Sequence, residues 1–161
     1  DELADELYDA LREIAQRALR GGRSELDPTE LVHEAWVRVA DKGRYAELPR
    51  VEFLALCATL MRRLLVDEAR KRVVRDQAPA RRLTLAGVAR EAHGKEVDLL
   101  GLDEALNRLA EVDPRWARVV ELRFFGGLTV PQAAEALRIS ERTVDRDWTM
   151  ARAWLKRELG R

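Results

Sequence analysis

This chain of 161 residues has little of what marks a secreted, membrane-spanning or metal-binding protein. It contains one cysteine and two histidines. Because Cys57 has no intrachain partner, no disulfide can form, and we expect a small core residue in a reducing, cytoplasmic setting. The longest apolar run, residues 53–66, is interrupted by Arg62 and Arg63. It is too short to cross a bilayer, so no membrane association is expected. No signal peptide is recognised, and a start at Asp1 leaves a preceding segment open.

Aromatic residues are also sparse, at 6% of the chain. Few segments alternate apolar and polar residues as a strand does, and the abundance of Ala, Leu, Arg and Glu predicts an all-α protein. There is no Gly-rich phosphate loop, no Cys/His metal set and no nucleophile motif, so we expect no enzyme and no cofactor. His33-Glu34 begins like a metalloprotease pair, but position 37 is valine, and no metal site is expected.

A surplus of charge of either sign is missing too, because 29 basic residues balance 29 acidic ones. The distribution is uneven, however. Acidic residues dominate residues 1–13, whereas residues 62–82 carry a local net charge of +5. A neutral total with one concentrated basic segment suits a protein that contacts both a protein partner and a nucleic acid.

Periodicity and helix-start signals divide the chain into two small helical domains. The expected helices span about 3–19, 28–40, 51–75 and 102–109, and a further helix is opened by Asp113-Pro114. Residues 77–98 lack a strong period and are predicted to be a linker that could hold one short helix. The predicted domains are therefore residues 1–76 and residues 99–161.

Residues 128–144 are the most informative stretch, because they predict two helices joined by a very tight turn. Thr129 can cap the first helix, and Pro131 falls in its first turn. Ser140 can cap the second. Arg138 stands in the turn, where glycine is common, and arginine adopts positive φ only at a cost. This pattern is typical of a helix-turn-helix, whose second helix enters the DNA major groove.

The second of these helices has two contrasting faces at about 100° per residue. The apolar face contains Val144, Trp148, Ala151, Leu155 and Leu159. The opposite face contains Arg142, Arg146, Thr149 and Ala153. Two arginines near the N-terminal end can pair with guanine edges or with phosphates. The alternative is an ordinary helical hairpin with solvated arginines.

Two further helical stretches carry polar faces. The basic half of the third helix could follow DNA phosphates, or it could be a solvated face in which Asp67 pairs with Arg63 or Lys71. In the second helix, the apolar residues are expected to be buried on one side. The polar residues on the other side could face solvent or a docking partner. That polar face consists of Glu30, His33, Glu34 and Arg38.

Taken in order, these pieces resemble a bacterial RNA polymerase sigma factor of the extracytoplasmic-function (ECF) group. The matching stretches are ELVHEAW at 30–36, FLAL at 53–56, RRLLVDEARKR at 62–72, VVELRFFGGLT at 119–129 and SERTV at 140–144. The resemblance covers nearly the whole chain. It implies that the first domain docks on the β′ clamp helices of core polymerase and reads the −10 promoter element. It also implies that the second domain reads the −35 element, with the β subunit a further partner and an anti-sigma factor a common one.

Carried over by position, the resemblance assigns three sets of residues. The polymerase-binding set is Glu30, His33, Glu34 and Arg38. The −10 set is Arg62, Arg63, Asp67, Arg70, Lys71, Arg72 and Arg75. The −35 set is Ser140, Glu141, Arg142, Thr143, Asp145 and Arg146. Many members have Asn where this chain has Arg63, so a −10 base is expected to be held differently here.

The main alternative is a one-component transcription regulator whose N-terminal half senses a ligand or dimerises. A sensor domain has no need of a basic stripe, so residues 62–75 favour the sigma-factor interpretation.

Overall fold

The computed structural model describes residues 48–76, 82–84 and 96–160, together with residues 9, 12, 30, 33–35 and 37–38. These residues are almost entirely helical, which confirms the all-α expectation apart from two short strands. The elements are α3 (Arg50–Asp76), β1 (Arg82–Thr84), β2 (Glu96–Asp98), α4 (Leu99–Val112), α5 (Pro114–Val120), the π-helical turn η3 (Glu121–Phe125), α6 (Val130–Leu137) and α7 (Glu141–Leu159).

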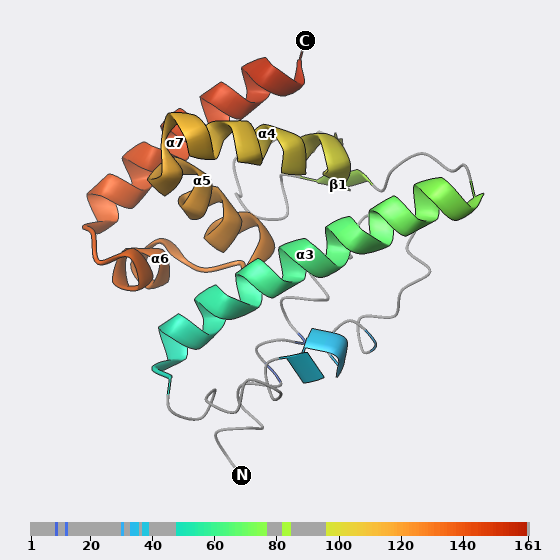
Figure 1. The fold of residues 1–161 in the computed structure, drawn as a ribbon. Coiled ribbons are helices and arrows are strands. Elements are labelled where there is room, and N and C mark those ends of the chain that lie inside the picture. The colour runs from blue at the N-terminus through green and yellow to red at the C-terminus, as the bar shows by residue number, and fades with distance from the viewer. Residues whose placement is uncertain are drawn as a thin grey trace.

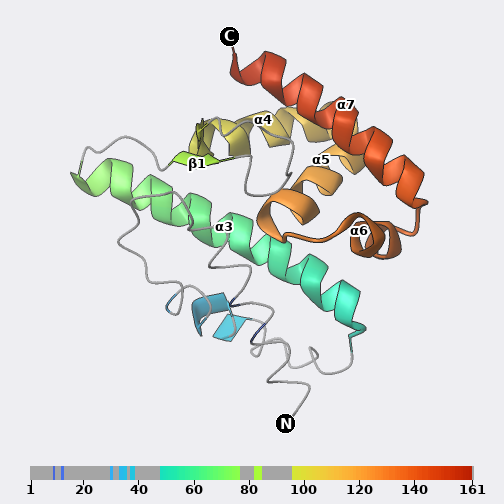
Figure 2. The same cartoon turned by 180° about the vertical axis from the view of Figure 1, so that it is seen from behind.

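The long helix α3 crosses the middle of the molecule, and its bounds lie within one residue of those predicted (Figure 1). Helices α4 to α7 lie on one side of it, and the described residues between 30 and 38 lie on the other, as the reverse view also shows (Figure 2). The first half of α3 is buried around most of its circumference. A helix that is apolar on all sides needs cover on all sides. Buried side chains of α3 and of the C-terminal helices form one cluster, so the two predicted domains share a core.

The predicted linker contains a short antiparallel ladder. Strand β1 pairs with β2 so that Leu83 faces Val97, and β2 leads directly into α4. The described part of this segment is therefore strand, not the short helix that the sequence allowed. Residues 77–81 and 85–95 lie outside the described residues. Three-residue strands are too short to show an alternating pattern, which is why periodicity gave no sign of them.

The helix-start signals of the second half are confirmed. Asp113 accepts hydrogen bonds from the backbone N–H groups of Arg115 and Trp116, with Pro114 in the first turn of α5. Thr129 and Gln132 form a reciprocal capping box at the start of α6. Each such cap is worth about 1 kcal/mol, so the chain itself fixes where these helices begin.

The helix opened by Asp113 and Pro114 is α-helical only as far as Val120. It widens into η3, a π-helical turn that leads to Gly126. A Cβ at position 126 would lie 2.6 Å from the Cβ of Ala58 on α3 and 2.7 Å from the carbonyl oxygen of Leu122. Glycine is therefore required where the end of η3 meets α3.

The turn between α6 and α7 keeps a glycine-like backbone although arginine occupies it. Arg138 has φ 57° and ψ 44°, in the left-handed region. The backbone N–H of Ile139 donates to the carbonyl of Ala134 at 3.0 Å, which closes the end of α6. The tight turn is thus formed by strained arginine, and Ser140 caps the next helix immediately.

This strain gives a stability prediction. Replacing Arg138 with glycine should raise the free energy of unfolding by up to about 1 kcal/mol, because relief of the left-handed penalty outweighs the extra unfolded-state entropy of glycine. A β-branched residue, as in Arg138→Val, should lower it by about 1 kcal/mol or more. Urea unfolding with an unchanged slope measures both. A less stable Arg138→Gly protein would show that the arginine side chain contributes contacts of its own.

Candidate nucleic-acid interface

The two faces of α7 are divided as the sequence predicts. Val144, Trp148, Ala151 and Leu155 are buried. Arg142, Arg146, Thr149 and Ala153 are exposed on the opposite side. The apolar face anchors α7 to the core, and the polar face is left open to solvent.

The first two turns of α7 present most of the residues assigned to the −35 element. Glu141, Arg142, Asp145 and Arg146 are exposed and stand close together on these turns. Ser140 and Thr143 instead serve the helix start, since the Ser140 Oγ accepts from the Thr143 N–H at 3.1 Å and their hydroxyls are 2.8 Å apart. Both hydroxyls are therefore already engaged, while the four charged side chains are available.

An ion pair between a buried aspartate and an exposed arginine joins α7 to α5. Arg115 Nε donates to Asp147 Oδ2 at 2.6 Å, and Arg115 Nη2 donates to Asp147 Oδ1 at 3.2 Å. Only 1% of the Asp147 side chain is exposed. The carboxylate hydrogen-bonds to Arg115 and raises the pKa of that guanidinium. The sequence analysis missed this pair. Asp147 follows Val144 by three residues and precedes Ala151 by four, so it lies close to the buried face of the helix. A carboxylate in that position needs a partner.

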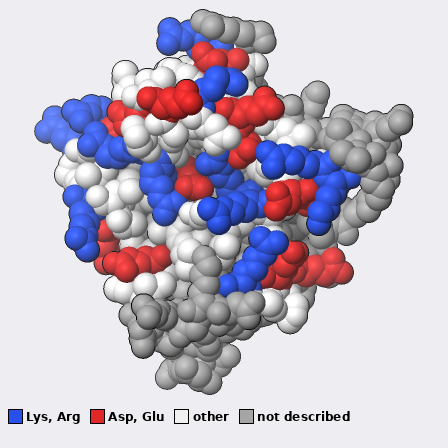
Figure 3. Space-filling view, viewed as in Figure 1, with Lys and Arg blue, Asp and Glu red and all other residues white. Residues whose placement is uncertain are grey.

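Two arginines lie over the indole ring of Trp148. The guanidinium of Arg123 is 4.8 Å from the ring centroid, and that of Arg152 is 5.7 Å away. Burial lowers the pKa of Arg123. Arg123 adds positive charge beside α7, and Arg152 lies on α7 itself. Figure 3 shows basic side chains gathered along the edge of the molecule that α7 forms. Arg123 was missed because it stands in an otherwise apolar stretch.

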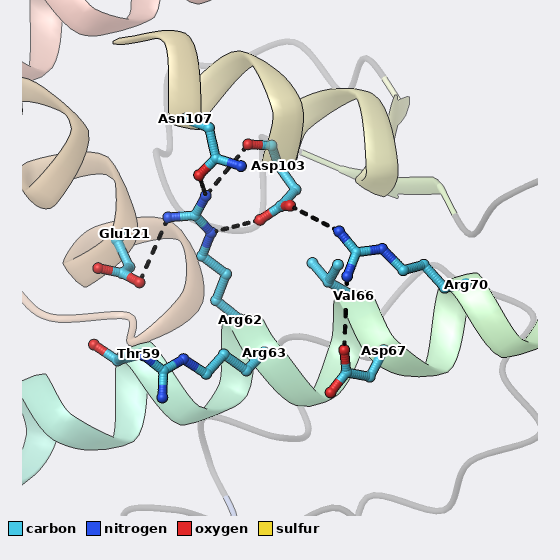
Figure 4. Close-up of a pocket in the computed structure, with 9 residues that line it drawn as sticks. All are labelled: Thr59, Arg62, Arg63, Val66, Asp67, Arg70, Asp103, Asn107 and Glu121. Atoms are coloured by element: carbon cyan, nitrogen blue, oxygen red, sulfur yellow. Dashed lines mark hydrogen bonds and ion pairs between the residues drawn. The ribbon is translucent and has the colours of Figure 1, made fainter. Parts of the chain in front are cut away.

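The basic residues of α3 divide into two groups. Arg62 points toward the C-terminal helices, and its Nε donates to Asp103 Oδ1 at 2.8 Å. Its Nη2 donates to Asn107 Oδ1 at 3.0 Å, and its Nη1 lies 3.6 Å from Glu121 Oε1 (Figure 4). Only 16% of the Arg62 side chain is exposed. In this arrangement Arg62 is bound to protein rather than open to DNA.

The second group is exposed. Arg63 and Lys71 lie on the surface of α3. Arg70 lies 3.9 Å from Asp67 and 3.7 Å from Asp103, measured between the nearest nitrogen and oxygen. The pairing of Asp67 with Arg63 or Lys71, considered from the sequence, is replaced by pairing with Arg70. The side chains of the two remaining −10 residues, Arg72 and Arg75, lie outside the described residues.

The residues assigned to polymerase docking lie together on the far side of α3. Glu30, His33, Glu34 and Arg38 are helical and exposed. Arg38 Nη2 and Glu34 Oε1 are 3.4 Å apart, one helical turn away from each other. Ala35, between them in sequence, is fully buried. The described part of this helix therefore has a charged outer face and a buried inner one.

None of the helices in the described part of the chain is long and apolar enough to cross a membrane. A comparison with curated protein sequences found no match. Among solved structures, the chain is similar to the sigma factor RpoE of Bartonella quintana, in a co-crystal structure with the anti-sigma factor NepR. The two chains are 16% identical with a TM-score of 0.46, over 99% of this chain and 97% of that one.

A family profile described as ECF sigma factor matches residues 1–161. Members of this family are transcription initiation factors rather than enzymes. The structure agrees with that membership. Its core is helical, one face of α7 is open, and a second helix on the far side of α3 exposes Glu30, His33, Glu34 and Arg38. The chain belongs to the ECF sigma factor family, and its function is that of a sigma factor, which binds core RNA polymerase and directs it to promoters.

Proposed function

We propose that the sigma-factor activity is divided between the two halves of the chain. Residues 1–76 bind core polymerase and read the −10 element, and residues 99–161 read the −35 element through a helix-turn-helix made of α6 and α7. The observation that carries this division is the open N-terminal face of α7, whose other face is buried in the core. A recognition helix needs one face fixed and its N-terminal residues free to reach base edges.

On α7, Arg142 and Arg146 are the proposed readers of −35 bases. Both are exposed, and they are four residues apart, so they share one side of the helix. A guanidinium can donate two hydrogen bonds to the edge of one guanine, a geometry that lysine cannot reproduce. Glu141 and Asp145 flank them and could accept from cytosine amino groups. The structure thus offers donors and acceptors together at the entering end of the helix.

On the other half, the polymerase-docking surface is the exposed side of the helix containing Glu30, His33, Glu34 and Arg38. Its charges are of both signs and lie on the side of α3 opposite to α4–α7. This separation would let core polymerase, through its β′ clamp helices, approach without displacing α7. An anti-sigma factor is a further proposed partner, and the cytoplasm is the proposed location.

Substitution of the two α7 arginines tests the −35 assignment. Arg142→Ala or Arg146→Ala should cost about 1–3 kcal/mol of binding to the preferred promoter and relax the preference at one −35 position. Arg157→Ala is the matched control, because it removes the same charge from an exposed site near the other end of α7. Binding is measured on a library of promoter variants with reconstituted holoenzyme. Equal losses on every promoter for all three variants would contradict base reading by α7.

A further inference from the structure

We propose that the third turn of α7 adds a thymine contact to the −35 reading face, made by Thr149 and Met150. The group that they recognise is the C5-methyl of a thymine base, which is displayed in the major groove. The contact rests on the proposed function, in which the first two turns of α7 read the −35 element, and it extends that reading by one turn.

The outward face of α7 changes character along its length. In the first two turns of the helix the exposed residues are charged, namely Glu141, Arg142, Asp145 and Arg146. The next turn exposes three uncharged residues, Thr149, Met150 and Ala153. Charged residues make up 36% of the chain, so an outward turn without charge is a local departure. The face is therefore polar where the helix begins and largely apolar one turn later.

Met150 is the largest apolar side chain of this turn. It is 47% exposed, whereas Trp148 and Ala151, its neighbours on the other side of the helix, are buried. A methionine side chain is flexible and polarisable, which suits contact with an apolar partner of irregular shape. Met150 follows Arg146 by four residues, so the two side chains are neighbours on the helix surface. A base that meets Arg146 therefore brings the next bases within reach of Met150.

Thr149 presents its methyl group because its hydroxyl is already engaged. The Oγ1 donates a hydrogen bond to the backbone carbonyl of Asp145 at 2.9 Å. The hydroxyl hydrogen is thus used within the helix, and the γ-methyl is the part of the side chain left for outside contact. A threonine methyl is one of the apolar groups that pack against the methyl of thymine.

The place of Thr149 on the helix fits a base-reading role. Helices that lie in the major groove can read bases from four positions separated by three, one and three residues. Arg142, Asp145, Arg146 and Thr149 have this spacing. Thr149 and Met150 lie about 4.5 Å and about 6 Å farther along the helix axis than Arg146, which is about one to two base-pair steps. We therefore expect the thymine one or two base pairs from the base that Arg146 reads.

The neighbours of this turn favour DNA over a protein partner. A protein that covered Met150 would also cover Arg146, one helical turn away, and would block the reading proposed for it. DNA that meets Arg146 instead reaches Met150 as part of the same surface. On the base edges of the major groove, the apolar group is the thymine methyl.

Replacement of thymine by uracil tests the contact, because uracil lacks only the C5-methyl group. In the promoter that reconstituted holoenzyme binds best, each thymine of the −35 element is replaced singly, on either strand. We expect one of these replacements to weaken binding about fourfold, the factor that corresponds to burial of one methyl group. This comparison needs no change in the protein.

Three protein variants show whether Thr149 and Met150 cause that loss. Thr149→Ser/Met150→Ala removes the apolar contacts, so it should bind the thymine and uracil promoters almost equally. Thr149→Val keeps a methyl group without the hydroxyl, so it should stay sensitive to uracil. The matched control is Val112→Ala, which truncates an apolar residue of α4 that is 62% exposed, and it should keep the fourfold loss. Circular dichroism confirms that each variant is folded.

Three results would overturn the thymine contact alone. The first is a −35 element in which changes of guanine weaken binding but which has no thymine, or none that uracil affects. The second is a fourfold uracil loss that persists in Thr149→Ser/Met150→Ala. The third is weaker binding of Met150→Ala to core polymerase without DNA, which would make this turn a protein contact. A holoenzyme with no −35 preference at all would refute the proposed function and the thymine contact together.

Discussion

Replacing Arg115 with methionine should lower the free energy of unfolding by about 3 kcal/mol, the largest stability loss that we expect from any single exposed position. The loss comes from what happens to Asp147, the partner of Arg115, and not from the loss of the arginine itself. Asp147 is 1% exposed, and its carboxylate is bound by two nitrogens of Arg115. Methionine keeps much of the stem but leaves a buried negative charge without a counter-charge. Urea unfolding measures the loss.

The two ends of this pair should behave unequally. In Asp147→Leu the remaining guanidinium, which is 43% exposed, can turn into water, so we expect a loss of only about 1 kcal/mol. The double variant Arg115→Met/Asp147→Leu should recover most of the Arg115→Met loss, because no buried charge is left. Additive losses in the double variant would show that the two side chains are not energetically coupled and that α7 is held by its apolar face alone.

Exchanging Glu34 and Arg38 should weaken binding to core polymerase by at least about a hundredfold. The double variant Glu34→Arg/Arg38→Glu reverses the charge at two positions of the proposed docking face, and like charges brought together at an interface cost several kcal/mol. The exchange keeps the net charge and the one-turn ion pair, so helix content and melting temperature should hardly change.

The matched control for this exchange is Arg50→Glu/Glu52→Arg, which swaps two exposed charges in the first turn of α3. It should bind core polymerase normally. Full binding by the folded Glu34/Arg38 variant would place the docking surface elsewhere. Equal loss in both exchanges would point to a general electrostatic effect instead of a specific face.

The local parts of this fold were predictable because their signals lie within a few residues of one another. Thr129, Pro131 and Ser140 identify the starts of α6 and α7, and the structure confirms each of them. The faces of α7 follow from helical periodicity alone. Arginine disfavours the left-handed backbone that a tight turn needs. Arg138 nevertheless takes that conformation, because the flanking helices determine the backbone there.

The unpredicted parts are those in which distant residues decide the structure. Arg62 was assigned to DNA from its place in a basic stripe, and nothing near it in the sequence indicates an acceptor 41 residues away. The π-helical turn before Gly126 depends on how closely α3 approaches. One signal for these long-range ion pairs is present in the sequence, namely an acidic residue among core positions. Asp103, Glu121 and Asp147 are such residues, and each is buried with an arginine partner.

For the residues of the proposed sites, the sequence predicts exposure correctly but does not establish their role. Sequence placed Arg142 and Arg146 on an open face, and the structure confirms their exposure. Whether they read bases stays a prediction, because exposure permits contact with DNA and does not choose a base. The same holds for Glu30, His33, Glu34 and Arg38, whose exposed face is compatible with docking.

Run-off transcription with purified core RNA polymerase tests the central claim most directly. A library of random promoter sequences is transcribed with core enzyme alone and with core enzyme plus this chain, and the transcript starts are sequenced. We expect the chain to produce defined starts preceded by two short shared sequence elements, about 10 and 35 base pairs upstream. Transcripts that are identical with and without the chain would contradict the account.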